Sequence, residues 1–159
     1  MSFRHAVTAL VFLASLRCSG FDSTAFQPAS LAAWQRSLLQ SGQFSQSTPG
    51  YMFDSQFPKL LTTVEFTGHV RALSKEKTEF LLAFTRTVGK TELLAAYRSE
   101  FEVREAGKSY WILVQKAKLD ALSKSVKPGV RFKLYHRFAG VAQGRVFFYL
   151  MTDLSVSGR

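Results

Sequence analysis

Cationic and aromatic residues alternate along one segment near the C-terminal end of the sequence. The residues that do so are Arg131, Lys133, Tyr135 and Arg137. Side chains two positions apart share a face of a strand, so these four are expected to project together. Cations in such a row could neutralise phosphates while the tyrosine stacks on a base. The pattern therefore suits a polyanion with stackable bases, such as a single-stranded nucleic acid.

Aromatic residues in two other segments extend this predicted surface. Phe147 and Tyr149 are expected on the outer face of the last predicted strand. Tyr110 and Trp111 are adjacent and must point to opposite faces of a strand. At least one of that pair must leave the core. The complete predicted surface comprises Tyr110, Trp111, Arg131, Lys133, Tyr135, Arg137, Phe147 and Tyr149. A structural alternative stays open, in which the cations protect an exposed strand from edge pairing and the rings cover a neighbouring segment.

The sequence contains little that favours catalysis. Val-Gly-Lys-Thr at 88–91 matches the end of a phosphate-binding loop, but Phe84 stands where that loop requires its first glycine. His69 and His136 have no further histidine or carboxylate at a metal-ligand spacing, and the alternation predicts that His136 faces the core while His69 faces outward. We therefore predict a protein that is not an enzyme and that carries neither a metal nor a cofactor.

Periodicity predicts the elements that would position these side chains. Apolar and polar residues alternate, or β-branched and aromatic residues gather, in five predicted strands at residues 64–72, 80–84, 110–114, 130–138 and 146–156. A polar turn is predicted at 74–77, and Gly68 suggests a bend of the kind that barrels use at corners. The residues predicted to share one core are Val64, Phe66, Leu82, Ile112, Val114, Phe132, Leu134, Phe148 and Leu150.

Two further segments have helical spacing. Residues 116–126 predict a short helix that Pro128-Gly129 ends. Residues 91–105 fit both helical and strand periodicities, and we favour helix. Five strands with a helix between the third and fourth is the arrangement of the OB fold. We therefore predict an all-β, small five-stranded OB-type barrel over residues 61–156.

Part of this pattern resembles bacterial-type and organellar single-stranded-DNA-binding proteins. The residues that carry the resemblance are Tyr110 to Val114, Lys118-Leu119, Lys127-Pro128-Gly129 and Val130 to Leu134, at that family's third strand, helix and fourth strand. The resemblance implies the OB fold and nominates Tyr110 as a stacking aromatic. The sequence departs from the family in an insert after the second predicted strand. It also lacks the acidic, Gly-rich tail by which bacterial members recruit partners.

The N-terminal residues have the layout of a targeting segment. Arg4 precedes an uncharged apolar run at 6–16, and Cys18-Ser19-Gly20 offers the small residues that a signal peptidase reads. The run is too short to span a bilayer, so we expect removal of residues 1–20 rather than a retained transmembrane anchor. Residues 21–60 are predicted to be a linker or transit-like extension, with a short amphipathic helix at 30–39.

The final compartment stays open at this point. Ala25-Phe26 resembles the junction of the bipartite leaders that carry proteins to plastids of secondary origin, and a mitochondrial leader is a further option. A secreted or periplasmic protein rarely meets single-stranded nucleic acid. The leader therefore supports a rival hypothesis, an exported OB module that binds a protein, a glycan or a cell-envelope component.

Composition bounds these alternatives. A chain of 159 residues, 47% of them hydrophobic, can bury one core and is too short for two ordinary domains. Its formal net charge of +10 favours an anionic partner. The one cysteine, Cys18, lies in the predicted leader, which excludes an intrachain disulfide and a cysteine-based metal site.

Overall fold

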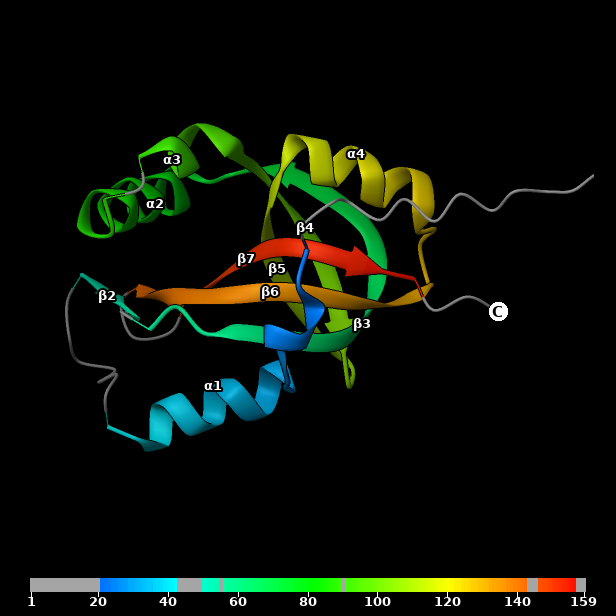
Figure 1. The fold of residues 1–159 in the computed structure, drawn as a ribbon, viewed down its shortest axis with the longest axis horizontal. Helices are drawn as coiled ribbons and strands as arrows, with labels where there is room; N and C mark the ends of the chain where they lie inside the picture. Colours follow the sequence, from blue (N-terminus) through cyan, green and yellow to red (C-terminus); the bar gives the residue numbers. More distant parts are fainter. Residues whose placement is uncertain (1–20, 43–49, 55, 90, 143–145, 157–159) are drawn as a thin grey trace, which may run out of the picture.

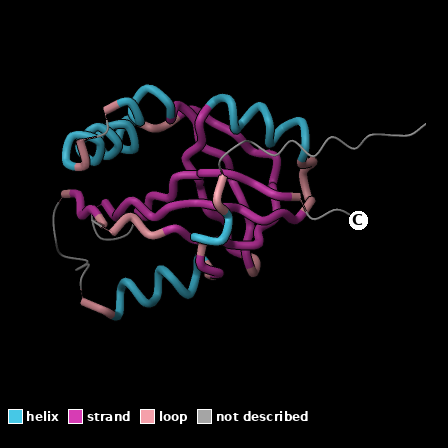
Figure 2. Tube along the Cα trace, in the orientation of Figure 1, coloured by secondary structure: helices cyan, strands magenta, loops and turns pink. Residues whose placement is uncertain are grey.

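The computed structural model describes residues 21–42, 50–54, 56–89, 91–142 and 146–156. Strands dominate this part of the chain, as the sequence predicts, and they form one curved sheet (Figures 1 and 2). The strands are β1 (Gln27–Pro28), β2 (Tyr51–Phe53), β3 (Lys59–Ala72), β4 (Tyr97–Glu105), β5 (Lys108–Gln115), β6 (Arg131–Ala142) and β7 (Val146–Ser155). The helices are the 3-10 turn η1 (Ser23–Ala25), α1 (Leu31–Gln40), α2 (Lys75–Thr87), α3 (Glu92–Ala96) and α4 (Lys116–Ser125).

Five of the strands close into a ring in the order β3-β4-β5-β7-β6, because β6 also pairs with β3. All neighbours in the ring are antiparallel except β5 and β7, which run parallel and pair only at Leu113 and Leu150 among the described residues. The short strands β1 and β2 add to the outer edges of β3 and β6. Gly68 has a φ of +90° where β3 shifts register against β4, so the predicted bend lies at this position.

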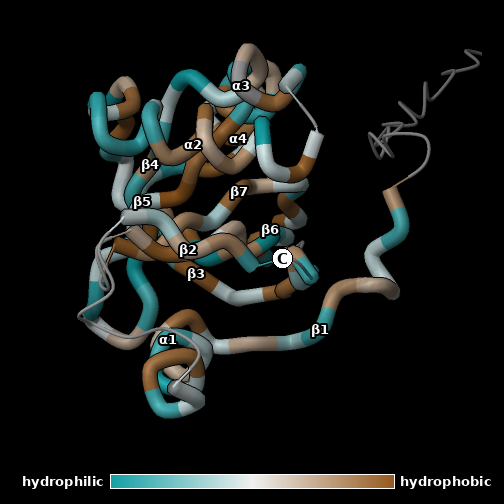
Figure 3. Tube along the Cα trace, turned by 90° about the vertical axis from the view of Figure 1, so that its left-hand side faces the viewer, coloured by the Kyte–Doolittle hydropathy of each residue, from teal (hydrophilic) through white to brown (hydrophobic). Residues whose placement is uncertain are grey.

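The helices lie on two opposite sides of the ring. Helix α1 covers one side, and α2, α3 and α4 lie on the other (Figures 1 and 3). Helices α1 and α4 bury Leu31, Leu38 and Leu122 in the cluster that fills the ring. Within the part of the chain that the structure describes, no helix combines the length and apolarity needed to cross a membrane.

The predicted core divides into two clusters. Six of its residues lie together inside the ring: Val64, Phe66, Ile112, Val114, Phe132 and Leu134. Phe148 and Leu150 instead pack outside the ring against Phe80 and Leu81 of α2. Adjacent positions of β7 face opposite sides of the sheet, so this strand contributes to both clusters.

The strand predicted at 80–84 is wrong, because these residues belong to helix α2. The hydroxyl of Ser74 caps the helix by accepting a hydrogen bond from the Lys77 N–H at 3.3 Å. Phe80 and Phe84 are four residues apart, a spacing that fits one face of a strand and one face of a helix equally well. Burial distinguishes the two, since Leu81 is buried whereas Leu82, predicted as core, is only half-buried.

The second strand of the ring comes from the segment 91–105, where we favoured a helix. Only Glu92–Ala96 is helical, and β4 follows directly. Phe101 and Val103 point into the ring while Glu102 faces outward, so the alternation of charged and apolar residues was the correct signal. The local spacing of this segment fits both a helix and a strand, and burial of one face inside the ring selects the strand.

The segment predicted as an extension, residues 21–60, contributes to the packed domain. Helix α1 forms where the sequence suggests it, and Ser30 caps it by accepting from the Ala33 N–H at 3.3 Å. The Glu105 carboxylate accepts from the Ala32 N–H and the Ser30 hydroxyl, both at 3.2 Å, and so anchors this helix N-terminus to the end of β4.

Candidate functional site

The four residues of the predicted row on β6 do not form one exposed surface. Arg131 and Lys133 are exposed, but Tyr135 is only 9% exposed and Arg137 is half-buried. Residues of the N-terminal segment cover Tyr135, with the rings of Phe21 and Phe26 edge-on at centroid distances of 4.9 and 5.3 Å. The predicted stacking role of Tyr135 is therefore incompatible with this arrangement, and the structural alternative describes this residue better.

Arg137 does not extend the row as a free cation. Its guanidinium lies over the ring of Phe57 at 4.8 Å from the centroid. The β6 face thus retains two exposed cations, Arg131 and Lys133, without an accessible aromatic ring between them. An isolated pair of basic side chains is an ordinary solvated surface.

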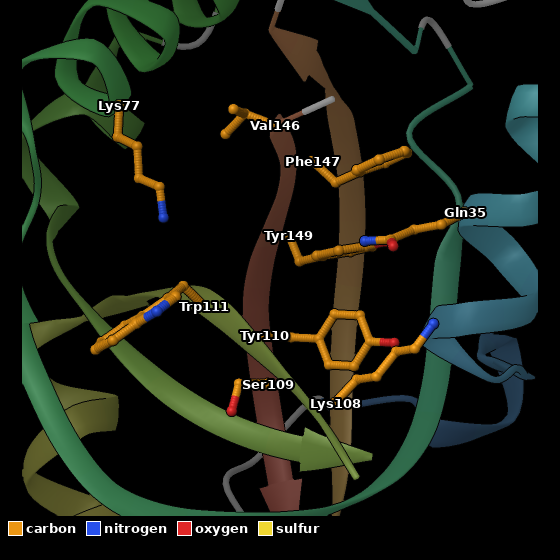
Figure 4. Close-up of a pocket in the computed structure, with 9 residues that line it drawn as sticks. All are labelled: Gln35, Lys77, Lys108, Ser109, Tyr110, Trp111, Val146, Phe147 and Tyr149. Carbon is orange, nitrogen blue, oxygen red and sulfur yellow. The ribbon is translucent and has the colours of Figure 1, made fainter. Parts of the chain in front are cut away.

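The other four predicted residues meet in one place. A pocket of about 350 Å³ lies between β5 and β7, and its walls come from both strands and from helices α1 and α2 (Figure 4). Its lining residues are Gln35, Lys77, Lys108, Ser109, Tyr110, Trp111, Val146, Phe147 and Tyr149. The strand residues all precede the single pair Leu113–Leu150, so the pocket occupies the stretch where the two strands are not joined.

Two adjacent residues of β5, Tyr110 and Trp111, line this pocket from opposite faces of the strand. Tyr110, Phe147 and Tyr149 point the same way, towards the side of α1, whereas Trp111 points the other way (Figure 4). The outer-face position predicted for Phe147 and Tyr149 is therefore wrong, because both pack in the ring core and Phe148 and Leu150 face outward instead. Tyr110 is 8% exposed and belongs to the ring core, and Trp111 is half-buried outside it. This confirms that one member of the pair leaves the core. The accessible ring is Trp111, however, and not Tyr110, which the family resemblance nominated.

A buried ion-pair network lies behind Trp111. Glu100 of β4 is 0% exposed, and its carboxylate accepts from the Arg71 Nε at 2.6 Å and from the Lys77 Nζ. The Arg71 guanidinium also lies 3.7 Å from the centroid of the Trp111 ring. Glu100 therefore holds two cations next to the pocket and offsets part of their charge.

Sequence analysis missed both Glu100 and Lys77. The polar turn predicted at 74–77 is wrong, because Ser74 caps helix α2 and the helix begins at Lys75. Only the helical position of Lys77, one turn before the buried Phe80 and Leu81, could have indicated that it faces the sheet.

Burial affects the two pocket tyrosines. Desolvation raises the pKa of the Tyr110 and Tyr149 hydroxyls above the ordinary tyrosine value, which is itself well above neutral pH, so both are protonated there. The Tyr110 hydroxyl is buried and has no hydrogen-bond partner among the described residues.

Each of the two histidines among the described residues contacts a different polar partner. His69 is exposed and its Nδ1 lies 2.7 Å from the Glu102 carboxylate, a contact that lowers the pKa of Glu102. His136 is buried, as predicted. The Thr62 hydroxyl donates to the Ala29 carbonyl at 2.9 Å, so it accepts from His136 Nε2–H at 3.0 Å. In the described ranges, no group of three or more potential metal ligands gathers.

Burial of His136 makes the stability of the domain depend on pH. Desolvation lowers its pKa from 6.5 to about 3. Between these values the unfolded chain binds a proton that the native state does not, so stability falls as pH falls. Lowering the pH from 7 to 5 should cost the wild-type protein about 2 kcal/mol more than a His136→Gln variant. Urea unfolding of both proteins at the two pH values measures this, and equal losses would contradict it.

Comparison with protein-family models, with curated proteins and with solved structures finds no significant match for this chain. The function must therefore be argued from the pocket and its surroundings.

Proposed function

We propose that the closed ring is an OB-type barrel and that it binds single-stranded nucleic acid, without catalysis, at the pocket between β5 and β7. The strand order supports the first part. Taking β3, β4, β5, β6 and β7 as strands one to five, α4 lies between the third and the fourth, and the third and fifth pair in parallel. This is the arrangement expected of the OB fold.

The position of the pocket supports the second part. OB folds bind oligonucleotides and oligosaccharides on the face of strands two and three, between the loops that follow strands one and four. In this chain these elements are the outer face of β4 and β5, the segment between β3 and β4 that holds α2 and α3, and the connection from β6 to β7. The pocket includes Lys77 from α2, Trp111 from the face, and Val146 at the start of β7.

The observation that carries the proposal is the half-buried indole of Trp111 in an open pocket, with Lys77 on the same side as the indole and Lys108 on the opposite side, towards α1 (Figure 4). Stacking of a base on an aromatic side chain contributes about 1–3 kcal/mol and tolerates any base. Lys77 is neutralised by Glu100, but Lys108 is exposed and has no ion-pair partner among the residues described. Stacking on Trp111 and a phosphate contact from Lys108 therefore replace the predicted β6 row as the basis of binding.

Binding to an oligonucleotide of about ten nucleotides, within the range that one OB fold covers, tests the proposal. In a Trp34→Phe background Trp111 is the one tryptophan of the sequence, so stacking should quench its fluorescence. Log affinity should fall with log salt, and Lys108→Ala should reduce the slope by about 0.7, the value for one phosphate contact on a single strand.

Lys133→Ala is the matched control for this experiment. It removes the same charge from an exposed position on β6, away from the pocket residues, and should leave the slope unchanged. If Lys133→Ala changes the slope and Lys108→Ala does not, the strand binds the β6 face instead. If no single strand binds even at low salt, where electrostatic attraction is strongest, the nucleic-acid proposal is wrong.

The neutral polar groups of the pocket favour a second candidate, an exported module that binds a glycan. Gln35, Ser109 and the unpartnered Tyr110 hydroxyl lie beside aromatic rings, and OB folds also take oligosaccharides on this face. Binding of a neutral oligosaccharide would be nearly independent of salt, because no counterions are released. The same titration therefore distinguishes the two candidates.

The compartment follows the ligand in both proposals. The predicted leader, residues 1–20, lies outside the described residues, and its removal after Gly20 stays a prediction. We place the nucleic-acid-binding protein in an organelle, a plastid or a mitochondrion, and the glycan-binding alternative in a secreted or periplasmic location. Sequencing the mature N-terminus from an isolated compartment decides between them.

A further inference from the structure

The two faces of the Trp111 indole have different surroundings. The Arg71 guanidinium covers one face at 3.7 Å from the ring centroid. Trp111 lines the pocket but Arg71 does not, and we infer from this that the guanidinium covers the face that is turned away from the pocket. The pocket-side face is left for a planar ligand.

Arg71 is itself held in place from the sheet. It lies directly opposite Glu100 in the β3–β4 register, and its Nε donates to one Glu100 oxygen at 2.6 Å. Lys77 from α2 binds the other oxygen, and Glu100 is fully buried. Because both carboxylate oxygens are engaged, the guanidinium is fixed between the carboxylate and the indole.

A fixed guanidinium limits the movement of the ring that it covers. A half-buried tryptophan on a strand can change rotamer, and ordering it when a ligand binds lowers affinity. Cation–π contact with Arg71 orders the ring before the ligand arrives. The charge of Arg71 is offset by Glu100, so its contribution is to ring position more than to phosphate neutralisation.

Building on the proposed function, we propose that Arg71 and Glu100 are positioning residues for the Trp111 indole. Glu100 fixes the Arg71 guanidinium over the ring face that is turned away from the pocket, so that one base of the bound strand stacks on the pocket-side face alone. The site then takes a single stacked base at Trp111. A base cannot enter on the other side without displacing Arg71 from Glu100.

Variants at Arg71 test this assignment in the Trp34→Phe background. Arg71→Ala should weaken single-strand binding roughly tenfold, about as much as Trp111→Ala does, and combining the two should add little, because both remove the same stacked base. Arg71→Lys keeps the charge but loses the planar contact, so it should not restore affinity. Arg71 is half-exposed, and thermal unfolding of each variant shows whether the domain is intact.

Arg104→Ala is the matched control. Arg104 lies on the same outer face of β4, is exposed to a similar degree as Arg71, and pairs only loosely with Glu65 at 3.7 Å. Its removal changes the net charge by the same amount and leaves the Arg71 guanidinium over the indole. It should reduce affinity slightly and add to the effect of Trp111→Ala.

A measurement without ligand separates this inference from the proposed function. Time-resolved fluorescence anisotropy of Trp111 should show a more mobile ring in Arg71→Ala than in Arg104→Ala. If no protein binds a single strand but this difference appears, the positioning role stands and the proposed ligand is wrong. If strands bind and the two variants have equal affinity and equal ring mobility, Arg71 is not a positioning residue.

Discussion

Truncation of Phe132 to alanine should lower the free energy of unfolding by about 3–5 kcal/mol, the usual cost of removing a large aromatic side chain from a packed core. Phe132 is 1% exposed and lies opposite Val64, where β6 closes the ring against β3. Its removal would leave a cavity that rigid neighbouring strands cannot fill. Urea unfolding at neutral pH measures the loss.

Arg131→Ala provides the control for this prediction. Arg131 is the preceding residue on the same strand and is exposed, so its truncation should change stability by no more than about 0.5 kcal/mol. If the two variants lose similar stability, the interior of the ring is not packed at Phe132, and the closed arrangement of β3 and β6 is wrong.

Replacing Glu100 by alanine should also cost about 3–5 kcal/mol, because it leaves Lys77 buried without a counterion. A double variant, Glu100→Leu with Lys77→Met, should recover most of this loss, since apolar residues of similar size often replace a buried ion pair without cost. Thermal and urea unfolding of the single and double variants measure both effects.

Glu102→Ala is the matched control for the Glu100 variant. Glu102 lies two residues further along the same face of β4 and pairs with the exposed His69. The His69 end of this pair is 74% exposed and the Glu102 end is 15% exposed, whereas Glu100 is fully buried, so the loss should be smaller than for Glu100→Ala. A Glu100→Ala variant that is as stable as Glu102→Ala would show that the network does not stabilise the fold.

Much of the ring could be predicted because parts of its strands alternate clearly. The predicted strand at 130–138 overlaps β6 from Arg131 onwards, where the buried Phe132 and Leu134 alternate with the exposed Arg131 and Lys133. The segment that became α2 could not be assigned by the same rule, since Phe80 and Phe84 fit two periods at once. Correct assignment there needs the partner surface, which is Phe148 on β7, stacked on Phe80 at 3.5 Å.

The candidate site was predicted only in part. The adjacent pair Tyr110 and Trp111 indicated correctly that one aromatic ring leaves the core. The coverage of Tyr135 by Phe21 and Phe26 could not be foreseen, because nothing in the local sequence of either segment reports on a contact between opposite ends of the chain. Lys77 could not be predicted as a site residue, because the helix that positions it, α2, was not predicted.

The closure of the ring has a consequence for how the chain folds. Lys59 pairs with Arg137 and Glu65 with Arg131, so β3 finds one of its two ring neighbours only after most of the chain has been made. Contacts between residues so distant in sequence form slowly, because a long loop must be ordered before they stabilise it. In a chain that emerges from a ribosome or a translocation channel, the apolar side chains of β3 therefore stay exposed to solvent until β6 has also emerged and can pair with β3. The ring can close only after the C-terminal strands have emerged. Until then the N-terminal half needs protection from aggregation.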